Sequence, residues 1–222
     1  RHARRPLPTP RAALHHAPTE SSRAYLLAEG VDDSSIVVTG NTVIDALLAT
    51  GGKEIPFPDP RLEDLAASGR RILLVTTHRR ENWGGAMEGV GRALARIARS
   101  FPDVEIVLPA HRNPVVREAV LPQLEGIENV TVTEPLPYGE FARLMALSTV
   151  IISDSGGVQE EAPSRGKPVL VMRDNTERPE AVAAGTVSLI GTDEARIERE
   201  VAPLLPDSRA YSALSGAPNP YG

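Results

Sequence analysis

From Arg71 onward, short apolar runs alternate with amphipathic helical stretches, and this alternation constrains the fold more than any other feature. In one stretch, Val90, Leu94 and Ile97 lie three and four positions apart, as on one face of a helix. Runs that are apolar throughout are typical of parallel strands covered by helices on both faces. The pattern therefore predicts an α/β fold, a Rossmann-like doubly wound parallel sheet. The predicted strands are 72–75, 104–108, 130–132, 150–152, 169–172 and 187–190.

The composition fits one large globular domain or two small ones. The 222 residues carry 24 Lys and Arg against 29 Asp and Glu, a formal net charge of −5, and 41% are hydrophobic. Nucleic acid is not expected as the main partner, because binding its phosphates needs an excess of Lys and Arg. The sequence has no cysteine and no apolar run near the roughly 20 residues of a membrane span. We therefore expect no membrane partner and no disulfide. No closely spaced set of histidines or carboxylates resembles a metal site, so we expect no metal, and we also expect no cofactor.

The chain is expected to divide at a proline-rich stretch. Three prolines alternate with other residues between positions 56 and 60, a composition that favours extended chain. We expect 1–52 to be an atypical basic front with the remnant of a first domain, 53–70 a linker, and 71–222 the main domain. The chain does not begin with Met and has no acidic residue before Glu20, which we interpret as a front that is cut or out of register. Before the linker we expect a helix over 19–29, a strand over 36–38 and a helix around 43–48.

Doubly wound folds bind ligands at the carboxyl ends of their strands, so the residues that follow each strand are candidates. Ser155, Gly156 and Gly157 follow one strand and begin a helix. Unobstructed backbone N–H groups and the positive helix end would then lie together and hold a phosphate. The alternative is a tight turn with a serine cap. Glu161, about one turn later, could accept hydrogen bonds from ribose hydroxyls, or it could be a surface carboxylate that compensates a helix dipole.

Two neighbouring strand ends carry basic turns. His78 and Arg79 follow the first predicted strand, and His111 follows the second. Histidine can donate to phosphate or act as an acid or base near neutral pH, and arginine offers a planar fork to phosphate oxygens. Arg178 stands at the start of a later helix and is a natural charge partner for a phosphate turn. Solvated basic loops are the alternative. The histidines that we interpret as structural or incidental are His15 and His16.

Six segments of the sequence occur together in one enzyme family. They are 16–20 (HAPTE), 38–47 (VTGNTVIDAL), 77–82 (THRREN), 153–163 (SDSGGVQEEAP), 173–180 (RDNTERPE) and 219–222 (NPYG). Together they closely resemble the bacterial non-hydrolysing UDP-N-acetylglucosamine 2-epimerases. The resemblance runs from about residue 15 to the end of the chain. The Ser-Gly turn differs from that of hydrolysing relatives, which favours the non-hydrolysing branch.

The resemblance implies a glycosyltransferase-B-like fold, in which two Rossmann-like domains hold a nucleotide sugar in the cleft between them. The chain would be the carboxyl-terminal, UDP-binding half, with a remnant of the amino-terminal domain and without the final C-terminal helix. The implied reaction interconverts UDP-N-acetylglucosamine and UDP-N-acetylmannosamine by elimination and re-addition of UDP, without a cofactor. The family's proton-transferring carboxylates lie in the amino-terminal domain, so we expect this chain alone to bind UDP weakly without exchanging the C2 proton. A cytoplasmic homodimer is implied for the full-length family.

The resemblance also implies which residues bind UDP. Ser155, Gly156 and Gly157 would hold the diphosphate. Glu161 would take the ribose hydroxyls, and Phe141 would lie beside the uracil. These expectations agree with the placement of the same residues after predicted strands.

Further roles are implied for the basic residues. His78 and Arg178 would face the phosphates, and His78 is the candidate catalytic residue. Arg79 and His111 would belong to an allosteric site for a second, activating UDP-N-acetylglucosamine molecule. Leu136 stands where some members have a polar residue near the base. Two alternatives stay open: a catalytically silent UDP-binding module, and half of a glycosyltransferase.

Overall fold

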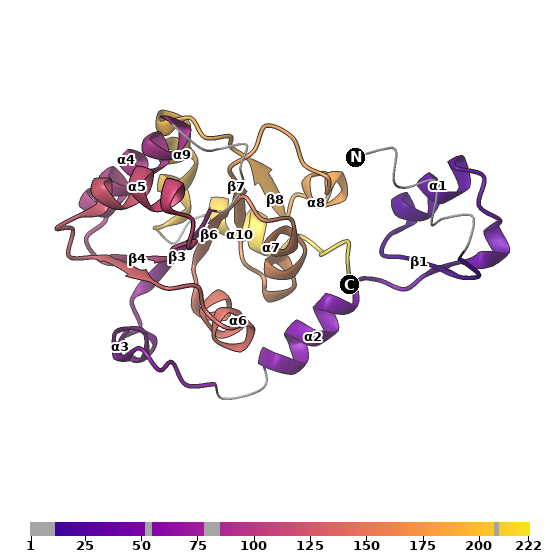
Figure 1. The fold of residues 1–222 in the computed structure, drawn as a ribbon, viewed down its shortest axis with the longest axis horizontal. Coiled ribbons are helices and arrows are strands. Elements are labelled where there is room, and N and C mark those ends of the chain that lie inside the picture. Colours follow the sequence, from indigo (N-terminus) through magenta and orange to yellow (C-terminus); the bar gives the residue numbers. More distant parts are fainter. Residues whose placement is uncertain (1–11, 52–54, 78–84, 207–208) are drawn as a thin grey trace.

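The computed structural model describes residues 12–51, 55–77, 85–206 and 209–222 of the chain (Figure 1). Within these residues the strands form a two-stranded and a six-stranded sheet, both parallel. The small sheet pairs β1 (His15–Ala17) with β2 (Ile36–Val38). The strands of the large sheet are β3 (Arg71–Thr76), β4 (Val104–Pro109), β5 (Val130–Thr133), β6 (Val150–Ser153), β7 (Val169–Val171) and β8 (Val187–Leu189).

The large sheet has the strand order β5-β4-β3-β6-β7-β8, which is the doubly wound order of Rossmann-like folds. The predicted doubly wound parallel sheet is therefore confirmed. Each of the six predicted strands is present, and its ends agree with the prediction to within one residue. The strand order reverses between β3 and β6. At such a point the flanking connections leave on opposite faces of the sheet, and a crevice opens at the carboxyl ends of the two strands.

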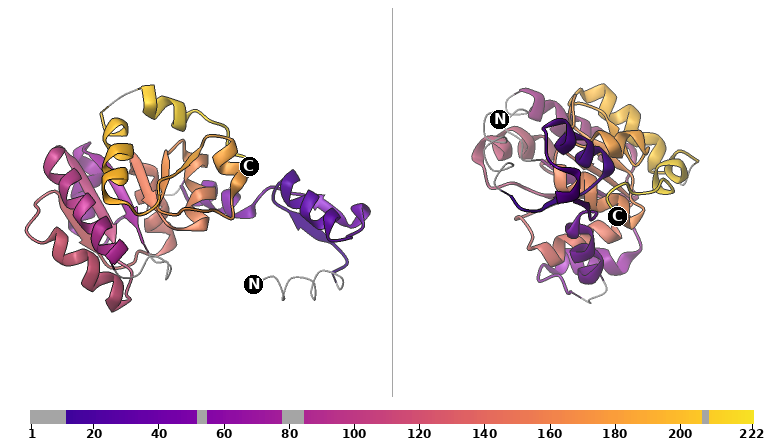
Figure 2. Two further views of the ribbon diagram at one scale, coloured as in Figure 1. Left: turned by 90° about the horizontal axis from the view of Figure 1, so that it is seen from above. Right: turned by 90° about the vertical axis from the view of Figure 1, so that its right-hand side faces the viewer.

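Helices cover both faces of the large sheet (Figures 1 and 2). In β3, Leu73 and Val75 are buried in one core, and Ile72 and Leu74 are buried in the other. Successive side chains of a strand point to opposite faces, so a strand covered on both faces is apolar at each of these positions. The helices that contribute to the first core are α4 (Gly85–Ser100), α5 (Pro114–Leu124) and α9 (Glu194–Val201). Those of the second are α2 (Thr42–Gly51), α3 (Pro60–Ser68), α6 (Tyr138–Leu147), α7 (Gly156–Glu161) and α8 (Pro179–Ala183).

Helix α3 lies inside the segment 53–70 that the sequence predicts to be a linker. Asp59 caps it by accepting a hydrogen bond from the Arg61 backbone N–H at 3.0 Å, and Pro60 is its first residue. Proline suits this position because its missing N–H would be unpaired there in any case. Leu62 and Leu65 are buried in the second core, so the end of the proline run starts a packed helix. The domain division at 53–70 stays a prediction.

The strands β1 and β2 and the helix α1 (Glu20–Ala28) form a small unit beside the large sheet (Figures 1 and 2). The predicted helix over 19–29 and the predicted strand over 36–38 are confirmed. The sequence does not predict β1, because its three residues carry no alternation and no β-branched side chain. The remaining short elements are 3₁₀ helices at Asp33–Ser35, Ala162–Arg165 and Ala202–Leu204, and α10 at Arg209–Ser215.

Candidate functional site

A cavity of about 210 Å³ lies at the carboxyl ends of β3, β4 and β6. Thr77 follows β3, His111 follows β4 and Ser155 follows β6, and each of these residues lines the cavity. Leu136 and Phe141 add an apolar wall. The cavity therefore lies where the strand order reverses, which is the usual ligand position in doubly wound sheets.

The turn after β6 is fixed to the neighbouring strand. The Ser155 backbone N–H donates to Ser153 Oγ at 3.0 Å, and Ser153 Oγ lies 2.7 Å from Thr76 Oγ1 of β3. The Ser155 side chain makes no hydrogen bond to α7, so it does not cap this helix, which contradicts the alternative of a serine cap. The first-turn N–H groups of α7 are thus left to other acceptors, as an anion site requires.

The two glycines at the start of α7 leave the backbone open. A Cβ atom at Gly156 would lie 3.9 Å from Arg178 Nη2, and one at Gly157 would lie 3.8 Å from both Glu161 Oε1 and Ser155 Oγ. These are ordinary contact distances, and neither glycine has a positive φ, so the fold alone does not demand glycine at either position. Glycine instead permits close approach of a ligand to the backbone. The same distances show that Arg178 and Glu161 converge on the turn.

Glu161 is buried beside this turn. Its exposed fraction is 8%, which contradicts the alternative of a surface carboxylate. Burial, together with the neighbouring charge of Glu160, raises the pKa of Glu161 to about 7. A carboxyl group that is protonated part of the time near neutral pH can both donate and accept hydrogen bonds. It therefore suits a hydroxyl-bearing ligand such as a ribose.

A relay of hydrogen bonds positions Arg178. Gln159 Nε2 donates to the Ser155 carbonyl at 3.0 Å, and Thr176 Oγ1 donates to Gln159 Oε1 at 2.6 Å. The Arg178 backbone N–H in turn donates to Thr176 Oγ1 at 3.0 Å. The guanidinium Nε donates to Glu160 Oε1. The segment between β7 and α8 is thus tied to the first turn of α7.

Sequence reasoning singles out none of Gln159, Glu160 and Thr176. The available signal is local: three polar residues in succession, Gln159 to Glu161, occupy a helix of only six residues, and all three are buried. Buried polar side chains need partners. Such a run therefore indicates a network rather than a solvated face.

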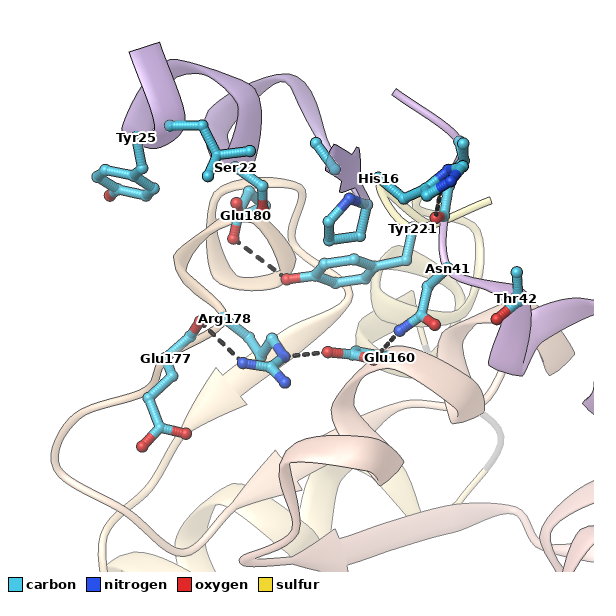
Figure 3. Close-up of a pocket in the computed structure, with 15 residues that line it drawn as sticks. His16, Ser22, Tyr25, Asn41, Thr42, Glu160, Glu177, Arg178, Glu180 and Tyr221 are labelled. Carbon is cyan, nitrogen blue, oxygen red and sulfur yellow. Dashed lines mark hydrogen bonds and ion pairs between the residues drawn. The ribbon is translucent and has the colours of Figure 1, made fainter. Parts of the chain in front are cut away.

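A second cavity, of about 720 Å³, lies between the small unit and the large domain (Figure 3). Arg178 and Glu160 line it from the large domain, and Tyr25 lines it from α1. His16, interpreted from the sequence as structural or incidental, also lines this cavity. Because Arg178 lines the second cavity and also approaches Gly156, the glycine turn lies between the two cavities.

The structure brings together most of the predicted site residues that it describes. Phe141, Ser155 and His111 line one cavity, so a second-ligand site at His111 would adjoin the first site rather than lie apart from it. The predicted residues that lie together at the glycine turn are Gly156, Gly157, Glu161 and Arg178. The predicted positions that lie outside the described residues are His78 and Arg79.

Two expected absences concern the described part of the chain. No group of three or more His, Asp or Glu side chains in that part could hold a metal ion. None of its helices combines the length and apolarity needed to cross a membrane. The expected absences of a metal site, a membrane partner and a cofactor stay predictions for the protein as a whole.

The comparisons with known proteins agree on one family. The family described as UDP-N-acetylglucosamine 2-epimerase matches residues 2–222. The chain is 51% identical over 217 residues to the UDP-N-acetylglucosamine 2-epimerase of Escherichia coli strain K12. This match covers 95% of the chain and 57% of the relative, so the chain spans less than two thirds of that protein.

Solved structures are similar to this chain in fold and in sequence. The UDP-N-acetylglucosamine 2-epimerase of Neisseria meningitidis, bound to UDP-GlcNAc, is 40% identical with a TM-score of 0.88, and the match covers 99% of this chain and 60% of that one. The Staphylococcus aureus MnaA structure with UDP is 40% identical with a TM-score of 0.90, and covers 99% and 59%. These similarities confirm the predicted relation to the glycosyltransferase-B-like fold. The chain belongs to the UDP-N-acetylglucosamine 2-epimerase family.

Proposed function

We propose that this chain binds UDP and UDP-N-acetylglucosamine at the carboxyl ends of β3, β4 and β6, as part of a non-hydrolysing UDP-N-acetylglucosamine 2-epimerase. The observation that carries the proposal is the convergence of Arg178 and Glu161 on the glycine turn that starts α7. The related structures from Neisseria meningitidis and Staphylococcus aureus contain UDP-GlcNAc and UDP, respectively, which supports the choice of ligand.

In this proposal the ligand spans the smaller cavity and the glycine turn. The uracil ring packs on Phe141, next to Leu136, where the wall is apolar. The ribose hydroxyls bind Glu161. The diphosphate accepts hydrogen bonds from the N–H groups at the start of α7 and from Arg178, because both the helix end and the guanidinium are positive.

The proposed elimination breaks two bonds, C2–H and C1–O. A carboxylate base, which the resemblance places in the amino-terminal domain, takes the C2 proton; the C2–H electron pair becomes the C1–C2 double bond, and the C1–O pair leaves with UDP. In the re-addition a UDP oxygen bonds C1 again while an acid returns a proton to C2 on the opposite face. The leaving UDP gains negative charge on its β-phosphate, and donors already oriented toward that phosphate stabilise the transition state. His78 and Arg79 lie outside the described residues, and their roles stay predictions.

The test is the substitution Arg178→Ala, with Arg112→Ala as a matched control. Arg112 is an exposed arginine that does not line the cavity at the glycine turn. Loss of a charge-assisted hydrogen bond to phosphate is expected to weaken UDP binding roughly 10- to 100-fold by calorimetry. Uridine has no phosphate, so its affinity is expected to change less than about twofold. Equal losses for UDP and uridine in Arg178→Ala would reject the phosphate role.

A second assay asks whether this chain alone carries the proton transfer. The chain is incubated with UDP-N-acetylglucosamine in deuterated water, and exchange at C2 is followed by NMR. Binding without exchange is the expected result, because the resemblance places the proton-transferring carboxylates in the amino-terminal domain. Exchange at C2 would contradict that expectation and would rule out a silent binding module. The homodimer, the cytoplasmic location and the second, activating ligand stay predictions.

A further inference from the structure

Glu160 joins the candidate phosphate site to the connection between the small unit and the large domain. The residue is 6% exposed. Its Oε1 accepts a hydrogen bond from Arg178 Nε, and its Oε2 accepts one from Asn41 Nδ2 (Figure 3). Its backbone carbonyl accepts from Asn219 Nδ2 at 3.0 Å. One buried carboxylate thus bridges the site arginine and a residue 119 positions earlier in the chain.

Asn41 stands at the start of α2, the helix that follows the small unit. Its Oδ1 accepts from the Val43 backbone N–H at 3.1 Å, and its own backbone N–H donates to the Tyr221 carbonyl at 3.0 Å. The Tyr221 hydroxyl donates to Glu180 Oε2 at 3.2 Å (Figure 3). Thr19, at the start of α1, donates to Glu180 Oε1 at 3.0 Å. The contacts at this connection therefore reach from the small unit to the carboxylate that holds the site arginine.

One bond to Glu160 and one to the Glu177 carbonyl fix where the guanidinium points. Nε is held by Glu160, and Nη1 donates to the Glu177 carbonyl at 3.2 Å. Nη2 is the atom that lies nearest to the position of a Cβ at Gly156, at 3.9 Å. Arg178 therefore bonds the protein through Nε and Nη1, and Nη2 is its nitrogen nearest to the glycine turn.

We propose that Glu160 is a positioning residue that aims Arg178 at the phosphate and makes this orientation depend on Asn41. The inference rests on the proposed function, in which Arg178 binds a ligand phosphate. A displacement of the small unit relative to the large sheet would change the hydrogen bond from Asn41 to Glu160. Through Glu160 it would also change where the Arg178 guanidinium points at the glycine turn. By linkage, a bound phosphate would favour the arrangement in which both bonds are made.

A purely structural role for Glu160 makes a different prediction. If the residue only stabilised the fold, its removal would weaken UDP and uridine binding alike, because both ligands use the same cavity. If it positions Arg178, its removal weakens binding of the phosphate-bearing ligand selectively. The ratio of the UDP affinity to the uridine affinity is therefore the informative quantity.

The experiment measures UDP and uridine affinities of the 222-residue chain by calorimetry for the wild type, Glu160→Gln, Asn41→Ala and the double variant. Glu160→Gln is expected to weaken UDP binding about tenfold and uridine binding less than about twofold. Asn41→Ala removes the remote partner of Glu160 together with the bond to the Val43 N–H, and it is expected to weaken UDP binding about threefold. The double variant is expected to match Glu160→Gln, because Asn41 acts through Glu160. Glu177→Gln is the control, because Glu177 lines the larger cavity as Glu160 does and the substitution removes the same charge from it.

Three results would overturn the proposal: equal losses for UDP and uridine in Glu160→Gln, an unchanged UDP affinity in Asn41→Ala, or additive losses in the double variant. If Glu160→Gln does not fold, as judged by circular dichroism, Asn41→Ala in the Arg178→Ala background decides, because the coupling predicts no further UDP loss there. A selective UDP loss in Arg178→Ala with no effect of Asn41→Ala would refute only the coupling. A wild type without preference for UDP over uridine would refute both the coupling and the proposed function.

Discussion

Replacing Glu161 by glutamine is expected to stabilise the protein above pH 7 while leaving its stability near pH 4 unchanged. Burial raises the pKa of Glu161 to about 7, and the neighbouring charge of Glu160 adds to the effect. Glutamine has nearly the same shape and no charge. The substitution therefore removes the cost of ionising a buried carboxyl group and keeps the packing at the glycine turn.

The sign follows from the order of the two pKa values. Below the ordinary value of 4.5, Glu161 is protonated in the folded and the unfolded chain, and its ionisation contributes nothing. Between 4.5 and about 7 the unfolded chain loses the proton first, so the free energy of unfolding falls as the pH rises. Above the folded pKa of about 7 the loss is complete. This difference between the folded and unfolded pKa of Glu161 corresponds to a loss of about 3 kcal/mol at most in the free energy of unfolding. Water that reaches the cavity reduces the expected loss to about 1 to 2 kcal/mol.

The assay is urea denaturation of the wild type and Glu161→Gln at several pH values between about 4 and 8. The two free energies of unfolding are expected to coincide at the acid end and to diverge as the pH approaches 8. Glu177→Gln serves as the control, because Glu177 is exposed and its change should give a small difference without this pH dependence. A difference between wild type and Glu161→Gln that is constant across the range would refute the reasoning.

The remaining predictions concern ligand contacts. Gly156→Ala is expected to keep or slightly raise the melting temperature, because alanine is favoured over glycine in a helix by about 1 kcal/mol and its Cβ finds room, yet to weaken UDP binding at least about tenfold where the methyl group meets the phosphate. A melting curve and a UDP titration of the same sample test both parts, and unchanged UDP affinity would contradict the placement of the diphosphate. Phe141→Ala is expected to weaken UDP and uridine binding by the same factor, about three- to tenfold, because it removes only the wall for the base. A loss confined to UDP would place the base elsewhere.

The large sheet could be predicted from the sequence because the pattern that marks each of its strands lies within a few consecutive residues. Each strand of the large sheet is a short apolar run with a helical stretch beside it, and burial on both faces explains why a strand such as Ile72 to Val75 shows no alternation. Helix α3 was harder to predict from the sequence. A run of prolines favours extended chain, and here its last member, Pro60, instead begins a helix. The strand β1 has three residues and depends on its pairing with β2, a tertiary contact.

In the candidate site too, some features could be predicted from the local sequence and others could not. Ser155, Gly156 and Gly157 are identifiable because a strand, a glycine pair and a helix start follow one another within a few residues. The burial of Glu161 could not be read from its neighbours, since a short helix can place a glutamate on either side. The bridge from Asn41 to Glu160 joins residues far apart in the chain, and no local pattern marks it.

A crystal structure of the 222-residue chain with UDP tests the ligand site most directly. The diphosphate is expected to accept hydrogen bonds from the N–H groups of Gly156 and Gly157 and from Arg178, with the uracil ring against Phe141. UDP bound with its diphosphate away from this turn, for instance in the larger cavity on the side of Tyr25, would contradict the proposed site.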